Sequence, residues 1–346
     1  MRASFFPEAI VYKQWRQLRG WLIAWALFTW AGPVHTLVGY WTAMQTRTAY
    51  SPPPELLAQP VIAMLHTLDP HVNAARHLAM AALVVGVVPM AMERARGRLL
   101  ITLAAPIRRR DLLATQIAIC LTGIWGVLLV LTLFDIAVNK AFGTVVPTVQ
   151  ILAWFLMEGL QTTAAFAVGF AVSIGVGPTL FAMVCALLLA LVPSYAAMMT
   201  TELANMTMHG PAYWNAVNRI TQAVESLSPI QGPSLWSEHP VISPWHVGLW
   251  YAVWSVGWLA LAFAMFRRLP LEREGGLFSF DALWDVLLVG TGLMAGTVLG
   301  LIAVGGMSQN PQRTPVLLAV WILVAALTWL TGRLLLTRLA RRARRA

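Results

Sequence analysis

The chain has 346 residues, of which 58% are hydrophobic and only 11% are charged. Soluble domains carry about 25% charged residues, so this composition excludes an ordinary water-soluble protein and predicts an all-α polytopic membrane protein. The net charge of +10 also fits a nucleic-acid-binding protein, but the basic residues cluster beside apolar runs, which indicates membrane topology and no nucleic-acid partner.

The apolar runs predict eight transmembrane helices within a single transmembrane domain, because each approaches the length of about 20 residues that crosses a hydrocarbon core. In chain order they lie near residues 20–41, 74–92, 112–136, 150–173, 178–200, 246–266, 283–305 and 315–336. The first six form a core over residues 1–268, and the last two occupy residues 269–346 together with a basic tail. Residues 42–73 and 201–245 are predicted to form long loops on the outer side.

Lys and Arg residues are distributed unequally over the two sides of this topology. The side that carries both termini holds 19 of the 24 Lys and Arg residues, and the other side holds five. Cytoplasmic loops of membrane proteins carry such an excess of positive charge. We therefore expect a multi-pass protein of the plasma membrane with both termini in the cytoplasm.

The segment before the first span predicts a helix in the cytoplasmic membrane interface. Val11, Trp15 and Leu18 recur at helical spacing on one face, whereas Lys13 and Arg16 lie on the other. Such a helix turns its apolar side toward the membrane and its cations toward anionic headgroups. An ordinary basic flank of the first span is the alternative.

A basic segment, Met92–Leu113, separates the second and third spans. It contains six arginines and two acids. Leu99 and Leu103 share a helix face at spacing i, i+4, and Arg94 and Arg98 share another. This pattern predicts a short rod with an apolar edge that inserts into a partner and a cationic edge. A plain intracellular loop that obeys the charge rule fits the same residues.

The same segment resembles the coupling-helix region of permease subunits of type-2 ATP-binding-cassette (ABC) exporters. Gly97 and Pro106 keep the nine-residue spacing between glycine and proline that is usual in that region. The full set of matching residues is Glu93, Gly97, Leu99, Leu103, Pro106, Arg109, Asp111, Leu112 and Leu113. Arg98, Leu100 and Gln116 depart from the Thr, acid and Lys that are common there. By this resemblance, the residues that couple to an ATPase also include Arg94, Arg98, Leu100 and Arg108.

The resemblance covers the layout of residues 8–268 and implies the membrane-spanning subunit of an ABC transporter, most directly an exporter. It also implies a second permease copy or paralogue as a dimer partner. Residues 266–280, which lead into the two additional helices, resemble eight-helix members from Gram-positive bacteria. The chain contains no G-x-x-x-x-G-K-[ST] loop. ATP and Mg²⁺ are therefore expected on a separate cytosolic ATPase subunit, with no cofactor in this chain.

Polar residues inside the apolar runs are candidates for a translocation path, because intramembrane charges are costly and often functional. Glu158 and Gln161 lie one helical turn apart, and Asp135 lies near a span end where water would reach it. A carboxyl near the outer membrane interface, or a protonated one that is hydrogen-bonded to a neighbouring helix, is the alternative for Glu158. The outer-side His66 and His71 do not share a helix face, so no metal site is expected.

Two classes of function therefore stay open. One is the transporter subunit just described. The other is a membrane protein without transport, namely a sensor, an assembly protein or an intramembrane enzyme. The sequence contains no H-E-x-x-H metalloprotease motif and no G-x-S-x-G nucleophile elbow, so we expect no catalytic residue in this chain.

Overall fold

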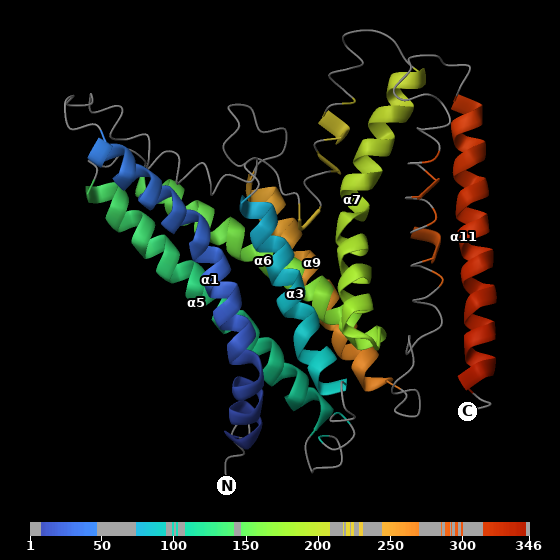
Figure 1. Ribbon diagram of the computed structural model, residues 1–346, viewed down its shortest axis with the longest axis horizontal. Coiled ribbons are helices and arrows are strands. Elements are labelled where there is room, and N and C mark those ends of the chain that lie inside the picture. The colour runs from blue at the N-terminus through green and yellow to red at the C-terminus, as the bar shows by residue number, and fades with distance from the viewer. Residues whose placement is uncertain are drawn as a thin grey trace. The chain divides into compact units, whose positions relative to one another are not determined.

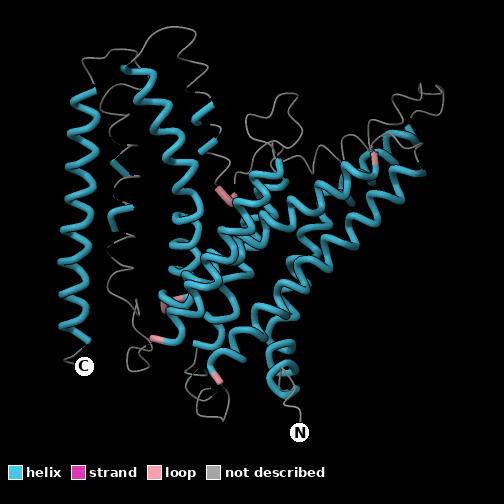
Figure 2. The backbone as a smooth tube through the Cα atoms, turned by 180° about the vertical axis from the view of Figure 1, so that it is seen from behind, coloured by secondary structure: helices cyan, strands magenta, loops and turns pink. Residues whose placement is uncertain are grey.

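A computed structural model of the chain provides the structure. It describes residues 8–46, 74–94, 99, 102, 108–141, 147–207, 217, 219–221, 223–224, 228–230, 244–269, 285, 288–290, 292, 295–296, 299 and 314–343. Regular structure over these residues is helical (Figures 1 and 2). The helices with continuous bounds are α1 Glu8–Thr46, α3 Ala74–Arg94, α5 Arg109–Ala141, α6 Thr148–Gly175, α7 Thr179–Thr207, α9 Pro244–Arg267 and α11 Thr314–Ala343.

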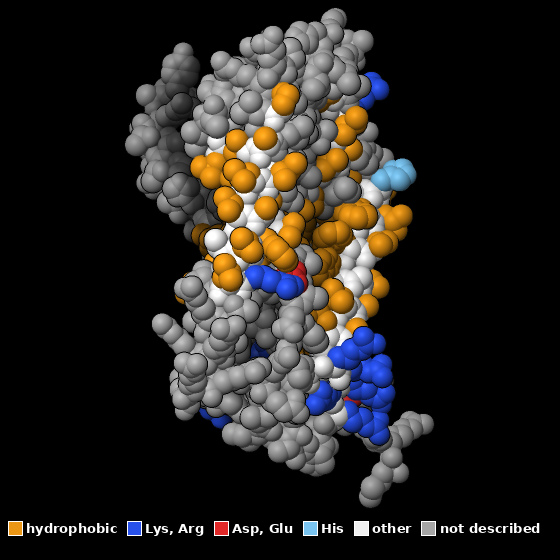
Figure 3. All heavy atoms as spheres, turned by 90° about the vertical axis from the view of Figure 1, so that its right-hand side faces the viewer, with side chains coloured by type: hydrophobic (Ala, Val, Ile, Leu, Met, Phe, Trp, Pro, Cys, Tyr) orange, Lys and Arg blue, Asp and Glu red, His pale blue; other side chains and the backbone are white. Residues whose placement is uncertain are grey.

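Three helical segments in the described part of the chain are long and apolar enough to cross a membrane. They are Arg109–Ala137, Thr148–Gly175 and Trp245–Arg267. Two shorter apolar helices are Thr179–Tyr195 and Ile322–Leu334. Figure 3 shows hydrophobic side chains over much of the described face, with Lys and Arg side chains gathered at one end. The all-helical, membrane-associated class is confirmed, whereas eight spans and the orientation of the termini stay predictions.

The chain divides into two compact units. The first comprises Met1–Leu187 and Pro229–Leu277, and the second comprises Leu188–Ser228 and Phe278–Ala346. Residues 188–228 thus group with the C-terminal segment, and the predicted six-helix core over residues 1–268 stays a prediction. Within the second unit, the Ser228 hydroxyl donates to the Ala190 carbonyl at 2.9 Å, which ties the far end of that segment to α7.

In the second unit, α11 packs closely against the residues near 285–292. A Cβ on Gly292 would lie 2.8 Å from the Cα of Ala325, so the two backbones approach closely there. The Arg333 guanidinium pairs with the Asp285 carboxylate at 2.6 Å and lies over the Trp329 ring, 5.1 Å from its centre. This charged pair links the two C-terminal segments near the end of α11.

The structure corrects the prediction of a separate interfacial helix. Residues 8–46 form one helix of 39 residues, with no break near residue 20 where the first span was predicted to begin. A helix of this length extends about 58 Å, well beyond the hydrocarbon core of roughly 30 Å. Between residues 11 and 22 there is no glycine pair or proline to interrupt the backbone hydrogen bonds.

The core of the first unit is built around α6, which packs against α3, α5 and α9, while α1 packs against α3 and α5 (Figure 1). The α3–α6 crossing depends on Gly86 and Gly169. A Cβ on Gly86 would overlap the Phe166 carbonyl oxygen, and a Cβ on Gly169 would overlap the Leu83 carbonyl oxygen. Small residues allow membrane helices to approach in this way and to gain close packing.

We predict that Gly86→Leu and Gly169→Leu each lower the free energy of unfolding by about 1–3 kcal/mol, because the added side chain forces the α3 and α6 backbones apart. Thermal unfolding of the purified chain in detergent measures this effect. Gly257→Leu is the matched control, since a Cβ there meets no atom within 4 Å. Equal losses in all three variants would contradict the assigned crossing.

Candidate functional site

The last turn of α3 places a buried carboxylate, Glu93, at the centre of a polar network. The side chain has 0% exposure. Its Oε1 accepts a hydrogen bond from Gln14 Nε2 at 2.8 Å and lies 3.1 Å from Lys13 Nζ. Its Oε2 accepts hydrogen bonds from Lys13 Nζ and from Thr102 Oγ1, both at 3.2 Å. Glu93 therefore receives donors from α1 and from the segment that follows α3.

The network continues beyond the carboxylate into α5. Lys13 Nζ also donates to Thr102 Oγ1 at 2.6 Å, and Gln116 Nε2 donates to Gln14 Oε1 at 3.4 Å. Buried polar groups are costly unless they are hydrogen-bonded, so each of these contacts favours one arrangement of the helices. The result is a cluster that joins α1, α3, α5 and Thr102.

Arg94, the final residue of α3, binds the carboxyl end of α6. Its guanidinium donates to the Val176 carbonyl at 3.1 Å and also to the Ile174 carbonyl. The last carbonyls of a helix lack partners within the helix and carry partial negative charge, so an arginine there satisfies them and interacts favourably with the helix dipole. The α3–α5 segment is thereby attached to α6.

Arg109, the first residue of α5, makes the equivalent contact with the end of α9. Its Nη1 lies within hydrogen-bonding distance of the carbonyls of Phe266, Arg267 and Leu269, at 3.4–3.5 Å. These are long, shared hydrogen bonds, and each is individually weak. Arg94 and Arg109 thus place one cation each at the carboxyl ends of α6 and α9.

The structure corrects the predicted role of Leu99. Its side chain has 0% exposure, so it packs inside the first unit and is not the edge that inserts into a partner. The Thr102 hydroxyl is likewise engaged by Lys13 and Glu93. Leu99 and Thr102 therefore pack within the first unit, and neither lies on a free rod.

Other residues of the predicted coupling set have different positions. Arg108 is exposed. Arg110, which was not in the predicted set, is exposed as well, and its Nε lies 3.5 Å from Asp111 Oδ1. The Asp111 carbonyl accepts a hydrogen bond from the Thr115 hydroxyl at 2.7 Å. The predicted residues that lie outside the described part of the chain are Gly97, Arg98, Leu100, Leu103 and Pro106.

The predicted faces of α1 are also partly wrong. Leu18 is buried within the protein and Val11 is half-buried, so Leu18 does not face the membrane, whereas Trp15 is 49% exposed and its membrane contact stays a prediction. Lys13 does not point toward headgroups, because its ammonium pairs with Glu93. Arg16 does remain exposed, and its guanidinium lies 5.9 Å from the centre of the Tyr12 ring.

Gln14, Thr102 and Gln116 belong to this site but were not among the predicted residues. All three are buried polar side chains, with exposures of 0–7%. The sequence contains one signal for Gln14, because it lies four residues from both Ile10 and Leu18 and is therefore a polar residue on their apolar helix face. No local pattern indicates that Thr102 would face Lys13, because that contact joins residues 89 positions apart.

Glu158 and Gln161 form a second polar site, in the outer half of α6 by the predicted topology. Their residue exposures are 3% and 4%, and within the described structure Glu158 Oε1 and Gln161 Nε2 have no hydrogen-bond partner. Tyr251 of α9 is close enough to Glu158 for the two to interact electrostatically. Asp135 is 1% exposed, so the prediction that water reaches it is wrong for this structure.

Comparisons with known proteins identify no relative: no family model, no curated protein and no solved structure matches this chain. Over the residues that the structure describes, no group of three or more His, Cys, Asp or Glu side chains is arranged to hold a metal ion. The chemistry of the site is therefore assigned from its own side chains, which bind helix ends and one another.

We predict that Lys13→Met lowers the free energy of unfolding by about 1–3 kcal/mol, because it removes the cation from a fully buried carboxylate. Thermal unfolding in detergent measures the loss. Lys140→Met is the matched control, since Lys140 is an exposed lysine at the far end of α5. Adding Glu93→Leu to Lys13→Met should restore part of the lost stability, and equal effects of the two lysine substitutions would refute the pairing.

Proposed function

We propose that this chain is the membrane-spanning permease subunit of an ABC transporter that works as an exporter. A separate cytosolic ATPase, which binds ATP and Mg²⁺, docks on the segment from residue 93 to residue 111. A second permease copy or paralogue completes the transport unit. The observation that supports this proposal best is that side chains from both ends of the segment contact the ends of three other helices.

The contacts define how movement of the segment is transmitted. Glu93 acts on α1 through Lys13 and Gln14, Arg94 acts on the end of α6, and Arg109 acts on the end of α9. Packed helices that share hydrogen-bonded ends move as linked bodies in shear or hinge motions. ATP-driven approach of two ATPase subunits would thus displace α1, α6 and α9 together.

The exposed cations of the segment supply the docking chemistry. Arg108 and Arg110 flank Arg109, and their side chains point away from the protein core, whereas Arg109 contacts α9. Charged residues at the rim of an interface steer the partner and fix its register. We assign an acidic surface of the ATPase as the partner of these two arginines.

Glu158 and Gln161 are proposed to line the translocation path. A buried acceptor and a buried donor without partners, one turn apart on α6, provide hydrogen bonds to a polar group that enters during transport. Polar residues inside membrane proteins commonly face a water-filled cavity for this reason. A hydroxyl group of a transport substrate would satisfy both atoms, because it can donate to Glu158 Oε1 and accept from Gln161 Nε2.

We predict that Arg108→Glu combined with Arg110→Glu reduces co-purification of a co-expressed candidate ABC ATPase by about tenfold or more, because the charges toward an acidic partner surface are reversed. Pull-down yield and ATPase rate of the complex measure the effect. Arg16→Glu with Arg19→Glu is the control, with the same charge change at exposed residues of α1 outside the docking segment. Unchanged assembly in the first variant, or a neighbouring gene for a kinase without any ATPase, would favour the non-transporting class.

We predict that a cysteine at position 158 reacts with a water-soluble thiol reagent faster when the ATPase turns over ATP, because the path then admits water. The experiment uses a chain in which Cys120 and Cys185, both buried, are replaced by Ala. Leu156→Cys is the control, since Leu156 is 38% exposed on the outer surface of α6. A labelling rate at position 158 that does not depend on ATP would remove Glu158 from the path.

A further inference from the structure

We propose that the surface of α1 around Gly20 binds the phosphate headgroup of an anionic membrane lipid, with Arg16 and Arg19 as its ligands. This site is distinct from the ATPase-docking segment and does not depend on transport. Its position next to the first apolar part of α1 places it at the level of lipid headgroups. The structure gives four observations that support it.

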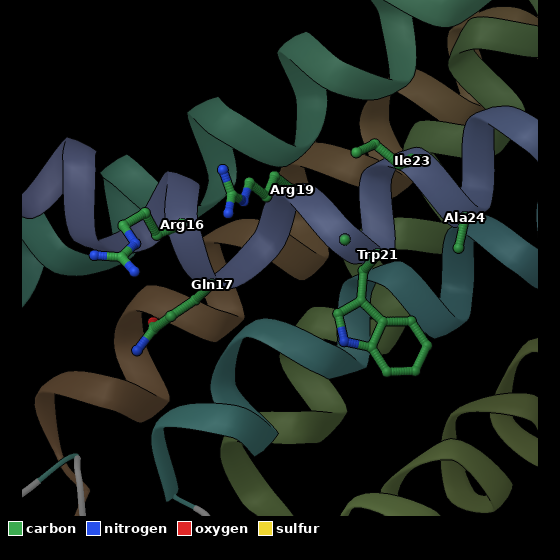
Figure 4. A pocket seen from close by; sticks show the side chains of 7 residues that line it. Arg16, Gln17, Arg19, Trp21, Ile23 and Ala24 are labelled. Atoms are coloured by element: carbon green, nitrogen blue, oxygen red, sulfur yellow. The ribbon is translucent and has the colours of Figure 1, made fainter.

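The first observation is a shallow, widely open hollow on the surface of α1, lined by residues of that helix. Gly20 and Ala24, one turn apart, are the small residues at its floor. A Cβ on Gly20 would meet no atom within 4 Å, so no neighbouring side chain fills the space above it. Figure 4 shows the side chains around this floor, all of which come from α1.

The second observation is the arrangement of the cations. Arg16 and Arg19 extend from adjacent turns at the basic end of the hollow, and both are exposed (Figure 4). Arginine matches phosphate oxygens with parallel N–H donors and is weakly hydrated, which favours it as a phosphate ligand. The Tyr12 ring beneath the Arg16 guanidinium, at 5.9 Å, helps to hold that side chain in place.

The third observation is that these arginines are available. Among the described residues, the ion pairs involve Lys13, Arg110 and Arg333, and none involves Arg16 or Arg19. Lys13, which was predicted to face headgroups together with Arg16, instead forms an ion pair with Glu93. The structure thus moves the predicted headgroup contact from Lys13 and Arg16 to Arg16 and Arg19.

The fourth observation is the continuity of the hollow with an apolar strip. Trp21 is 42% exposed beside the hollow, and Ile23 and Leu27, 58% and 69% exposed, extend it along the helix. Tryptophan favours the membrane interface, where one end of the ring is apolar and the other wet. From Gly20 to Leu27 the helix rises about 10 Å, which gives an acyl chain a surface to lie on. A free phosphate ion would use the arginines but would leave this strip unexplained.

The test measures lipid binding to the purified full-length chain by native mass spectrometry. Phosphatidylglycerol and phosphatidylcholine with identical acyl chains are titrated separately, and inorganic phosphate is added as a competitor. We expect phosphatidylglycerol to bind roughly tenfold more tightly than phosphatidylcholine, because two cations face its headgroup. Millimolar inorganic phosphate should leave this preference intact. If inorganic phosphate abolishes the preference for phosphatidylglycerol, the site binds free phosphate and the proposal is overturned.

Two pairs of variants separate a defined site from general attraction to positive charge. Arg16→Gln with Arg19→Gln should abolish the preference, whereas Arg267→Gln with Arg268→Gln, which removes equal charge elsewhere, should retain it. Gly20→Leu, which fills the hollow without a charge change, should weaken the preference at least severalfold, and Gly257→Leu should not. An equal reduction by both arginine pairs, or no effect of Gly20→Leu, would refute the site.

Discussion

The arrangement of the first unit depends on the buried carboxylate of Glu93. A fully enclosed carboxylate requires donors, and here they come from Lys13, Gln14 and Thr102. In a membrane the apolar surfaces of helices gain little by choosing one neighbour over another, since lipid tails are equally apolar. Polar contacts that must be satisfied can therefore determine which helices meet. Glu93 imposes this requirement at the point where α1, α3 and α5 converge.

The glycine crossing of α3 and α6 makes a second polar contact geometrically accessible. Gly86 and Gly169 bring the two backbones together, and Arg94 lies eight residues beyond Gly86, about 12 Å along α3. At that distance the guanidinium reaches the carbonyls of Ile174 and Val176 at the end of α6. A wider crossing would leave those carbonyls and the arginine apart. Close packing in the apolar region and capping at the helix end are thus parts of one geometry.

The sequence was sufficient to predict the helical class and insufficient to predict which face of each helix is covered. Hydrophobic length gave the helical class, and α5, α6 and α9 coincide with predicted spans. Periodicity assigned Lys13 to the face that meets lipid headgroups, but the buried acceptor that attracts it lies 80 residues away on α3. Leu99 was assigned to an exposed edge for the same reason: a helical repeat shows that leucines share a face, and only the neighbours decide whether that face is covered.

The arginines of the basic segment show why a charge count alone could not separate a plain loop from a coupling element. Arg94 and Arg109 bind helix ends, whereas Arg108 and Arg110 are exposed. All four contribute equally to the positive-inside bias, yet two of them also attach the segment to α6 and α9. A loop that only determined topology would need positively charged residues, but those residues would not need to contact other helices. Because its end residues hold the ends of other helices, a force applied to this segment would reach those helices, and the proposed docking on the outward arginines depends on that connection.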